Sequence, residues 1–574
     1  MPEIRLDLRQ PQRQLVEVTL SFLPRHYPLQ LRLPAWTPGS YLIRDYVRTL
    51  EGLSASAGGV PLAVQRTGVA SWRLLDGDDT RDASQPVTVR YRILATDLSV
   101  RTCQLDDEHA FLALAGVVLQ VEGERWSPHR LELLLPDGWQ AFLPLQAGDD
   151  GHWWTRDFDQ LIDTPVEAGP HPLHDFSVAG IPHRWVSWGG DLPLQDPGWL
   201  GDVEKVCAQC CRLMGEPRPA ASTYLFVLHQ NERGYGGLEH DDGCVLLYGR
   251  RDLERPEGRR RLLQLVAHEY LHQWNVRRLR PAELSPIDYD RPTIVPSLWF
   301  AEGVTSYCDQ LLPLAAGLSG ETELLEDLGA DLSRYLLTPG RRLQSLRQSS
   351  QEAWVKLYRQ DAHSADNQIS YYLKGAVLAL VLDLHLRRHG SWLGEVLQAL
   401  WHSHGRWRRG YRETDLLAAF TTRAADLAQL LPTWLEGHDD PPLQDYLNDV
   451  GLRLLPERCE HVDAGLQVEV AAGGGLQLRR VMRDGAGQRA GLQVGDELLA
   501  AAGRRLRSPE DLTAALRSLA VTAALPLLVC REGLVRERVL RPDPPAVARW
   551  RLEIDPQAPA SARERRRRWS CLQP

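Results

Sequence analysis

The sequence of 574 residues lacks features that mark several classes of protein. Lysine is almost absent: Lys205, Lys356 and Lys374 are the only three, so arginine supplies nearly all of the positive charge. The formal net charge is nevertheless −9, which gives no general attraction to nucleic acid. No run of residues is long and apolar enough to cross a membrane, so neither nucleic acid nor a membrane is an expected partner.

The sequence also lacks the signs of secretion. Residues 1–7 carry charges at alternate positions and contain no apolar segment, which argues against a signal peptide. Nine scattered cysteines, an odd number, favour reduced thiols over a disulfide framework, and we therefore expect a cytoplasmic protein. Cys207, Cys210 and Cys211 form a C-x-x-C-C cluster, but no second pair follows, so buried thiols on a helix are favoured over a metal site.

The most informative segment that is present is His268-Glu269-Tyr270-Leu271-His272, an H-E-x-x-H motif within apolar residues at helical spacing. Residues four apart share one face of a helix, so His268 and His272 can bind one metal ion. Glu269 lies beside them, where a carboxylate can act on water without binding the metal. The motif indicates a zinc metallopeptidase, and a chance match on a helix surface is the alternative.

A third ligand is expected downstream, because a catalytic zinc site uses three protein ligands and keeps one position open. Pro296 and Ser297 are typical of a helix start, and Glu302 is an acid in the apolar segment that follows. A carboxylate is costly to bury among apolar side chains unless it is paired or binds a metal. A structural salt bridge is the alternative, and the two histidines favour the metal.

A glycine-rich segment, Gly236-Gly237-Leu238-Glu239-His240, lies between apolar strand-like runs at residues 224–228 and 244–248. Glycine next to a strand lets a substrate backbone approach closely. A carboxylate at the edge of a cleft can bind a cation, such as the free N-terminus of a peptide. A plain hairpin turn explains the same glycines equally well.

Tyr371-Tyr372-Leu373-Lys374-Gly375 contains one of the three lysines. A tyrosine hydroxyl is a good donor to a developing oxyanion. Taken alone, tyrosines at the start of an apolar helix are more often part of the core.

Together these motifs resemble the glycyl aminopeptidases, gluzincin-type zinc metallopeptidases that end in a PDZ domain. The similarity covers residues 268–281, the Leu-Trp-x-x-Glu-Gly-x-Thr-x-Tyr pattern at 298–307 and the glycine-rich segment. It also covers Trp36-Thr37-Pro38-Gly39-Ser40-Tyr41 with Ile43-Arg44-Asp45, a signature of the family's leading β-domain. Four separated motifs in the family's order make the match specific.

The resemblance implies that His268, His272 and Glu302 bind one catalytic zinc ion and that Glu269 is the general base. The glycine-rich segment looks like the Gly-x-Met-Glu-Asn loop of the related aminopeptidase N family. The glutamate of that loop binds the α-amino group of the substrate, so the resemblance assigns this role to Glu239.

Aminopeptidase N enzymes also carry a Tyr-x-Lys-Gly element whose tyrosine stabilises the oxyanion. Its spacing matches Tyr372-Leu373-Lys374-Gly375, which favours Tyr372 over Tyr371 as the donor. One departure from the family pattern follows His240, where Asp241 and Asp242 stand in place of a small hydroxyl residue. Two acids near the amine site would strengthen cation binding or change the preferred substrate.

The fold class expected is a multidomain α+β protein. Short alternating segments predict an N-terminal β-sandwich at residues 1–168, and longer periodic runs predict a mainly helical, thermolysin-like peptidase domain at 169–450. Residues 455–545 resemble a PDZ domain, because 485–499 carry its A-G-L-x-x-G-D core. Residues 546–574 form a basic tail rich in proline and arginine, which we expect to be disordered.

Within the PDZ region, Ala464-Gly465-Leu466-Gln467 is the expected carboxylate-binding loop, and the strand after it the edge for peptide addition. Ser508 and Pro509 should open the helix beside that groove. A PDZ fold that serves only for packing is an equally good interpretation.

The sequence therefore predicts a zinc aminopeptidase that acts on peptides with a free N-terminus and, by resemblance, releases a small first residue, Gly or Ala. A peptide C-terminus at the PDZ groove is a further expected partner. One alternative is a zinc endopeptidase whose PDZ domain selects substrates. The other is a non-catalytic scaffold in which peptide binding by the PDZ domain is the function.

Overall fold

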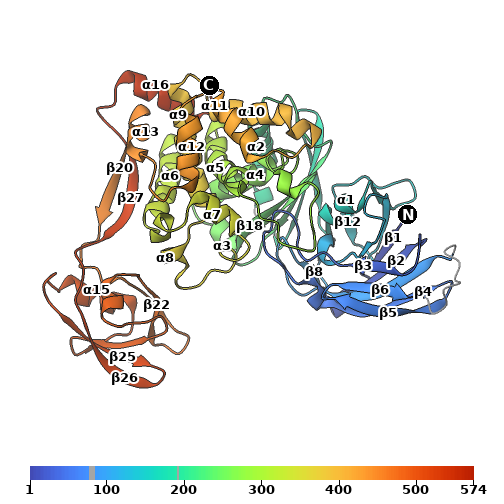
Figure 1. The fold of residues 1–574 in the computed structure, drawn as a ribbon, viewed down its shortest axis with the longest axis horizontal. Coiled ribbons are helices and arrows are strands. Elements are labelled where there is room, and N and C mark those ends of the chain that lie inside the picture. The colour runs from blue at the N-terminus through green and yellow to red at the C-terminus, as the bar shows by residue number, and fades with distance from the viewer. Residues whose placement is uncertain (76–84, 191–192) are drawn as a thin grey trace. The chain divides into compact units, whose positions relative to one another are not determined.

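The computed structural model describes residues 1–75, 85–190 and 193–574 (Figure 1). It divides into two compact units, of which the first comprises residues 1–295, 311–319 and 394–419. The second unit comprises residues 296–310, 320–393 and 420–574. The mixed α+β class predicted from the sequence is confirmed, with β-sheets in the N-terminal region, helices in the middle and a PDZ fold near the C-terminus.

Two sheets form the N-terminal part of the first unit. The larger has the order β10(Gln120–Val121), β3(Leu29–Arg32), β6(Ser71–Leu75), β5(Val60–Gly68), β4(Leu50–Ala57), β7(Val87–Leu94), β2(Leu15–Phe22), β1(Glu3–Asp7), β11(His129–Leu134), β13(Trp153–Thr155). The smaller has the order β12(Gln140–Phe142), β14(Pro165–Gly169), β9(Ala110–Ala113), β8(Cys103–Leu105). In β2 every second residue is buried, the period of a strand with one face on a core.

The first unit continues with a third sheet, in the order β15(Leu173–Val178), β16(Ile181–Trp188), β17(Tyr224–His229), β19(Gly243–Tyr248), β18(Tyr235–His240). Strand β17 is buried along its whole length between parallel neighbours, which explains its unbroken apolar run. The strand-like runs predicted at 224–228 and 244–248 are thus β17 and β19.

The glycine-rich segment is not the loop that the sequence indicated, because it forms the edge strand β18, antiparallel to β19. The peptidase region, predicted to be mainly helical, thus begins with a five-stranded sheet. Glycine lowers strand propensity, so the sequence of this segment did not show that it pairs with β19, the strand that follows it directly along the chain.

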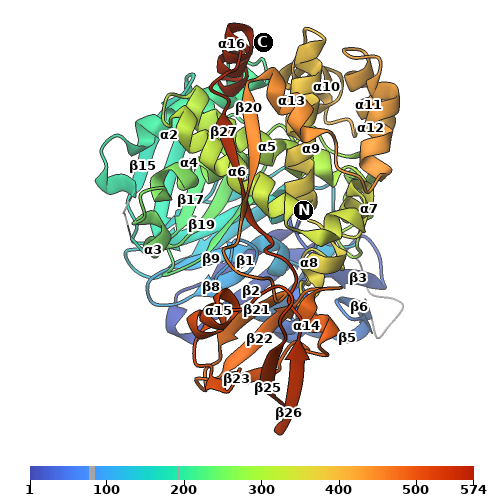
Figure 2. The same ribbon diagram turned by 90° about the vertical axis from the view of Figure 1, so that its left-hand side faces the viewer.

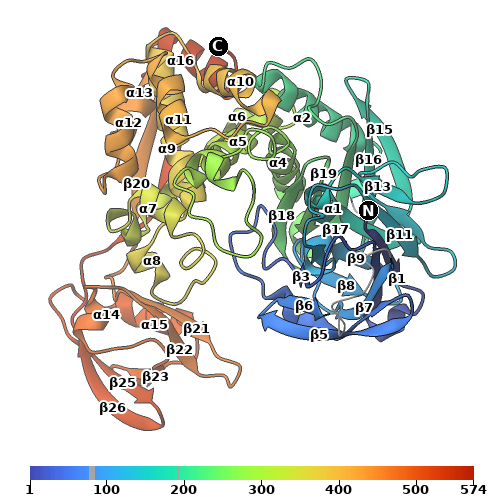
Figure 3. The same ribbon diagram turned by 45° about the vertical axis from the view of Figure 1, so that its right-hand side comes forward.

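Helices α2(Trp199–Leu213) and α4(Gly258–Leu271) pack on this third sheet (Figure 3). Cys207, Cys210 and Cys211 are buried on α2, as the sequence predicted, and in the described part of the chain no disulfide joins them. Helix α4 buries its apolar face, and the Tyr270 hydroxyl lies 2.9 Å from Nε2 of His183 on β16. Helix α10(Leu393–Ser403) joins the first unit through Trp401, whose indole donates to Glu216 at 2.7 Å.

The second unit is built around α9(Tyr371–Arg388), which is buried from residue 371 to 386 except at Tyr372. Ser370 caps this helix, since its hydroxyl accepts from the Leu373 amide at 3.5 Å. Around α9 pack α6(Glu321–Leu336), α7(Leu346–Gln351), α13(Leu443–Asp449) and the π-helical turn η6(Trp299–Gly303). Helix α5(Val304–Ala315) continues from η6, and α12(Leu427–Glu436) packs on α7. Among the described helices, none is long and apolar enough to cross a membrane.

The PDZ fold has strands β21(Leu466–Val470), β22(Leu476–Val481), β23(Glu497–Ala501), β25(Leu525–Arg531) and β26(Leu534–Leu540) in that order, with β24(Arg504–Arg505) on β23. Helix α15(Pro509–Arg517) begins after Ser508 as predicted, with Ser508 and Asp511 capping each other. The chain enters and leaves this fold through β20(Leu452–Arg458) and β27(Val547–Ile554), which pair antiparallel (Figure 2).

The expectation of a disordered C-terminal tail was wrong. Residues 547–554 form β27, and α16(Ala560–Ser570) packs on the second unit. The Trp569 indole is fully buried and donates to the Tyr307 hydroxyl at 2.7 Å, while Arg566 bonds Glu321 at 2.7 Å. The basic composition suggested disorder, but the buried Trp569 side chain and the buried guanidinium of Arg566, paired with Glu321, hold the segment in place.

A buried cluster of histidines joins two sheets of the first unit at Glu167 of β14. His109 Nδ1 and His171 Nε2 lie 3.0 and 3.1 Å from Glu167 Oε1, and His229 Nε2, on β17, lies 2.8 Å from Oε2. Burial lowers the pKa of His229. Burial opposes ionisation of Glu167, but His229 and the hydrogen bonds from the three imidazoles hold its pKa well below the usual range. The cluster is therefore a buried carboxylate held by imidazole N–H groups.

Replacing Glu167 with Gln should destabilise the first unit by about 3–5 kcal/mol, because it removes one partner from a buried, fully desolvated network. Amide hydrogen exchange of β14 and β9 measures the change locally, which suits a chain with several cooperative regions. Glu132→Gln is the control, because the pair of Glu132 with Arg5 is exposed and worth about 1 kcal/mol or less. Equal exchange in both variants would contradict the structural role of the cluster.

Candidate functional site

The H-E-x-x-H motif occupies the C-terminal end of α4, and His272 is the residue that caps it. The rings of His268 and His272 have centroids 4.6 Å apart at an angle of 85°. Nδ1 of His272 lies 2.6 Å from the carbonyl oxygen of Asn275, so this nitrogen carries the proton. Nε2 then carries the lone pair, as is usual for a histidine that binds a metal and is oriented by a backbone carbonyl.

Glu269 is directly beside the edge strand β18. It is 4% exposed, and a methyl group added at Gly237 would overlap its carboxylate. At Gly236, by contrast, an added methyl group would meet no atom within 4 Å. The Gly237 carbonyl accepts from Arg101 at 3.0 Å. The glycines of the motif thus differ: one admits the Glu269 side chain, and the other leaves open space along the strand edge.

Glu239 lies on the same strand and is 4% exposed. One ligand atom from each of Glu239, Glu269 and His272 lies within 4.8 Å of the other two. Oε1 of Glu239 is buried without a hydrogen-bond partner among residues 1–75, 85–190 and 193–574. Gly39, with φ +83°, turns so close to this carboxylate that an added Cβ would lie 2.6 Å from Oε2. The Trp-Thr-Pro-Gly-Ser-Tyr signature therefore supplies a wall beside Glu239.

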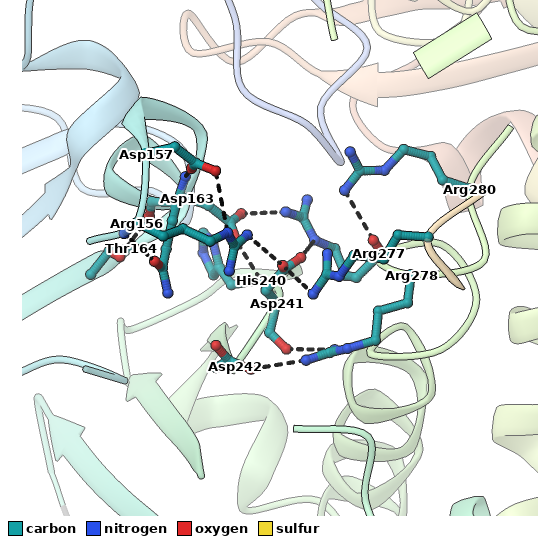
Figure 4. A network of polar contacts seen from close by, with 12 residues as sticks. Arg156, Asp157, Asp163, Thr164, His240, Asp241, Asp242, Arg277, Arg278 and Arg280 are labelled. Atoms are coloured by element: carbon teal, nitrogen blue, oxygen red, sulfur yellow. Dashed lines mark hydrogen bonds and ion pairs between the residues drawn. The ribbon is translucent and has the colours of Figure 1, made fainter. Parts of the chain in front are cut away.

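Asp241 and Asp242, which the sequence offered as two extra acids near the predicted amine site, are paired with arginines. Asp241 pairs with Arg277, and Asp242 pairs with Arg278 at 2.9 Å (Figure 4). Asp241 also pairs with Arg408. Burial opposes ionisation of Asp241, but Arg277 and Arg408 hold its pKa well below the usual range. The arginines that neutralise these acids are distant in sequence, so the local pattern could not show them.

Glu302 lies in the second unit, in the π-helical turn η6, and is 1% exposed. Turn η6 crosses α9 at two glycines: an added Cβ on Gly303 would lie 2.5 Å from the Gly375 Cα. This close crossing brings the start of α9 near Glu302, and the charge of Glu302 is among the groups that raise the pKa of Tyr372. The sequence predicted an α-helix here, whereas π-turns, which are common at functional sites, have no simple sequence signal.

The two candidate tyrosines differ in accessibility. Tyr371 is fully buried, whereas Tyr372 is half-buried at the start of α9. The hydroxyl of Tyr358 lies 3.4 Å from that of Tyr371 and 3.3 Å from that of Tyr372, and the sequence did not single it out. Burial, and then Glu302, raise the pKa of Tyr372 well above its usual value, so its hydroxyl keeps its proton at neutral pH. These observations favour Tyr372 as a donor.

Lys374 has a structural position instead. Its Nζ donates to the carbonyl oxygens of Arg341 and Gln344 at 2.9 and 3.1 Å, and burial lowers its pKa to about 8. Lys374 therefore ties the start of α9 to the η7 turn(Pro339–Arg342), while Gly375 permits the crossing with η6.

The predicted PDZ loop precedes an unpaired sheet edge. Ala464 is buried, Gly465 has φ +63°, and Leu466 and Gln467 begin β21, which ends the sheet order and packs beside α15. The Gly465 amide already donates to Asp463 at 2.8 Å. The loop and the edge strand thus have the arrangement that peptide addition requires.

Comparison with known families agrees with this arrangement. A model of the M61 glycyl aminopeptidases matches residues 261–378, a model of the Peptidase M61 N-terminal domain matches 3–170, and a PDZ domain model matches 478–531. These two parts of the chain are therefore similar to the M61 glycyl aminopeptidases, and the matches support a peptidase. No curated protein matches the sequence.

Among solved structures, the chain is similar to an aminopeptidase N family protein from Idiomarina loihiensis. The two share 28% identity with a TM-score of 0.91, covering 98% of this chain and 99% of that one. An M1 zinc metallopeptidase from Deinococcus radiodurans has 17% identity and a TM-score of 0.48, covering 77% of this chain and 94% of that one. The yeast LTA4 hydrolase in complex with bestatin has 14% identity and a TM-score of 0.47, with 77% and 68% covered.

Replacing Gly237 with Ala should lower kcat more than 100-fold, because the new methyl group must displace the Glu269 carboxylate, and small displacements of a catalytic group are costly. Gly236→Ala is the matched control on the same strand and should fold normally with a loss below about tenfold. The test is to measure kcat by steady-state kinetics, and the zinc content, for both variants. A Gly237→Ala enzyme with wild-type kcat would show that Glu269 does not need its observed position.

Proposed function

We propose that this chain is a zinc-dependent aminopeptidase that releases one N-terminal residue from peptides. The observation that carries the proposal is Glu239, a buried carboxylate with an unpartnered Oε1 close to Glu269 and His272. A buried charge is costly unless a partner of opposite charge joins it. The ammonium group of a peptide N-terminus provides such a partner, and its position then fixes cleavage after the first residue.

The residues fit zinc. His268 and His272 are two imidazoles one helical turn apart, and the hydrogen bond from Nδ1 orients His272; zinc prefers such nitrogen ligands. Glu302 is a buried acid, and a carboxylate commonly completes a zinc site with two histidines. We propose that His268, His272 and Glu302 hold a single ion. Zinc held there would lower the pKa of water and polarise the scissile carbonyl.

Glu269 and Tyr372 would perform the proton transfer and the charge stabilisation. Glu269 accepts a proton from the attacking water and passes it to the leaving amine, which requires a carboxylate that stays beside the substrate strand. Its contact with Gly237 keeps it there. The protonated hydroxyl of Tyr372 donates to the oxyanion that develops on the carbonyl oxygen.

The edge of β18 would bind the substrate backbone, with Gly236, Gly237 and Leu238 along it and His240 at its end. A small first residue, Gly or Ala, is the expected preference, and it rests on the family resemblance. We also propose that Ala464, Gly465, Leu466 and Gln467 bind a peptide C-terminus, because they precede the open edge of β21. If the PDZ groove instead selects substrates for internal cleavage, N-blocked peptides will be cleaved as well as free ones.

Replacing Glu269 with Gln should lower kcat by at least 10³-fold while one zinc ion per chain is retained, because only proton transfer is lost. His272→Ala is the comparison and should lose both the ion and activity, since it removes a ligand. Kinetics and metal analysis of the same samples test both statements. Wild-type turnover by Glu269→Gln protein would exclude the mechanism.

Replacing Glu239 with Gln should lower kcat/KM for glycyl-p-nitroanilide by roughly 30- to 1000-fold, the effect of removing one member of a buried charge pair. The residual rate on the N-acetylated compound should change by less than about threefold, because that compound has no ammonium group. Glu232→Gln, which alters an exposed pair with Arg251, serves as the control. Equal losses on both compounds would remove the amine-binding role from Glu239.

A further inference from the structure

Three segments of the first unit meet beside the amine site at Asp241 (Figure 4). One is the end of β18, where Glu239 and His240 lead into Asp241. The second is the chain that leaves the zinc-binding helix after His272, and the third is the end of α1(Phe158–Asp163). The contacts among these segments are short and buried, and they include ion pairs and hydrogen bonds to the backbone.

Arg277 is the side chain that all three segments share. Its Nη2 lies 2.6 Å from Asp163 Oδ1 and its Nε lies 3.1 Å from Asp241 Oδ1, with side-chain exposures of 5%, 12% and 8%. Burial opposes the charge of Arg277, but Asp163 and Asp241 raise its pKa above the usual value, so the guanidinium stays charged. A guanidinium presents donors in a fixed planar fork, which suits a bridge between two carboxylates.

The backbone of Arg277 is tied to a proposed zinc ligand. Its amide donates to the carbonyl oxygen of His272 at 2.9 Å, and the same short turn supplies the Asn275 carbonyl that accepts from Nδ1 of His272. Arg278 adds a second link, because its Nη1 donates to the carbonyl oxygens of Gln273 and Asp241 at 2.9 and 2.8 Å. The turn after the helix thus orients His272 on one side and holds β18 on the other.

Glu239 is two residues before Asp241 on the same strand. The Asp241 amide donates to Asp163 Oδ2 at 2.9 Å, and His240 Nδ1 lies 3.3 Å from Asp163 Oδ1. Because the Gly39 turn closes one side of the Glu239 carboxylate, a shift of β18 by a fraction of an ångström would move that carboxylate out of its place. The position of Glu239 therefore depends on how Asp241 and His240 are held.

We propose that Arg277 is a positioning residue for the amine anchor. By bridging Asp163 and Asp241, it fixes the end of β18 to the turn that follows His272, and so it sets the distance between Glu239 and the zinc-binding histidines. This inference rests on the proposed function, and it adds that the preference for a free amine depends on a residue that contacts no substrate.

The test compares two zinc-binding probes, glycine hydroxamate and acetohydroxamate, which differ in the α-amino group. The ratio of their inhibition constants reports the contribution of the amine alone, and a general loss of structure or metal affinity changes both constants together. In the full-length enzyme, we expect Arg277→Lys to reduce the preference for glycine hydroxamate at least tenfold, because lysine keeps the charge but lacks the fork. Inhibition by acetohydroxamate should change by less than about threefold.

Arg408→Met is the matched control. Arg408 also donates to the Asp241 carboxylate, at 2.8 Å, but it lies after α10 and not in the turn that follows His272. We expect the Arg408→Met enzyme to keep the wild-type preference for glycine hydroxamate within about threefold. A loss as large as that in Arg277→Lys would show that only the neutralisation of Asp241 matters, and it would overturn the proposal. Asp241→Asn is a second variant that should also lose the preference, and it replaces Arg277→Lys if that protein does not fold.

A double-mutant cycle with Glu239→Gln completes the experiment. In the Glu239→Gln background, Arg277→Lys should have little further effect on the ratio, since the anchor it positions is already gone. Additive effects, or an unchanged ratio in Arg277→Lys, would overturn the positioning role alone. A wild-type enzyme with no preference between the probes would overturn the amine-binding role of Glu239 in the proposed function and the positioning role with it.

Discussion

The packing of strand β18 against the end of helix α4 is the constraint on which the rest of the first unit's site depends. The contact is made where Gly237 has no side chain, so that the Glu269 carboxylate occupies the space that a Cβ would take. Two further elements of the first unit reinforce it: the Gly39 turn lies on Glu239, and the arginines after His272 hold the end of the strand. The edge of β18, the Glu269 carboxylate and the Glu239 carboxylate are thereby held in one arrangement by contacts that are buried and short.

In the second unit an analogous constraint acts between two helical elements. Gly303 and Gly375 let η6 and α9 cross at a distance that no larger residue permits. Glu302 precedes one of these glycines, and Tyr372 is three residues before the other, so the crossing determines where both side chains emerge. The tyrosine is only half-buried although its helix is almost wholly enclosed, and the lysine between it and the glycine bonds backbone carbonyls. The Tyr-x-Lys-Gly pattern thus combines one half-buried tyrosine with two residues that hold the helix in place.

Much of the fold could be predicted from the sequence, because its signals are local. The period of β2, the apolar run of β17, the capped starts of α9 and α15 and the H-E-x-x-H helix all follow from residues within a few positions of one another. What could not be predicted depends on partners far along the chain. Asp241 is neutralised by arginines 36 and 167 positions away, and α16 is ordered by the pairing of Trp569 with Tyr307. The role of Gly39 could likewise not be predicted, because it depends on contact with Glu239, which lies 200 residues later in the chain.

The pairing of β20 with β27 has a consequence for how this chain is built. The strands that lead into and out of the PDZ fold are neighbours, so the PDZ fold is an insertion between two strands of one ribbon and not a module appended to the end. The residues after it complete the helical unit, since α16 places Trp569 on Tyr307 and Arg566 on Glu321. Removing everything from the PDZ fold onward would therefore strip part of the core of the helical unit. Excising the PDZ fold alone, with a short turn joining Arg458 to Val547, leaves that core covered. Comparing the truncated chain with the excised chain therefore separates the role of the PDZ fold from its effect on the stability of the helical unit.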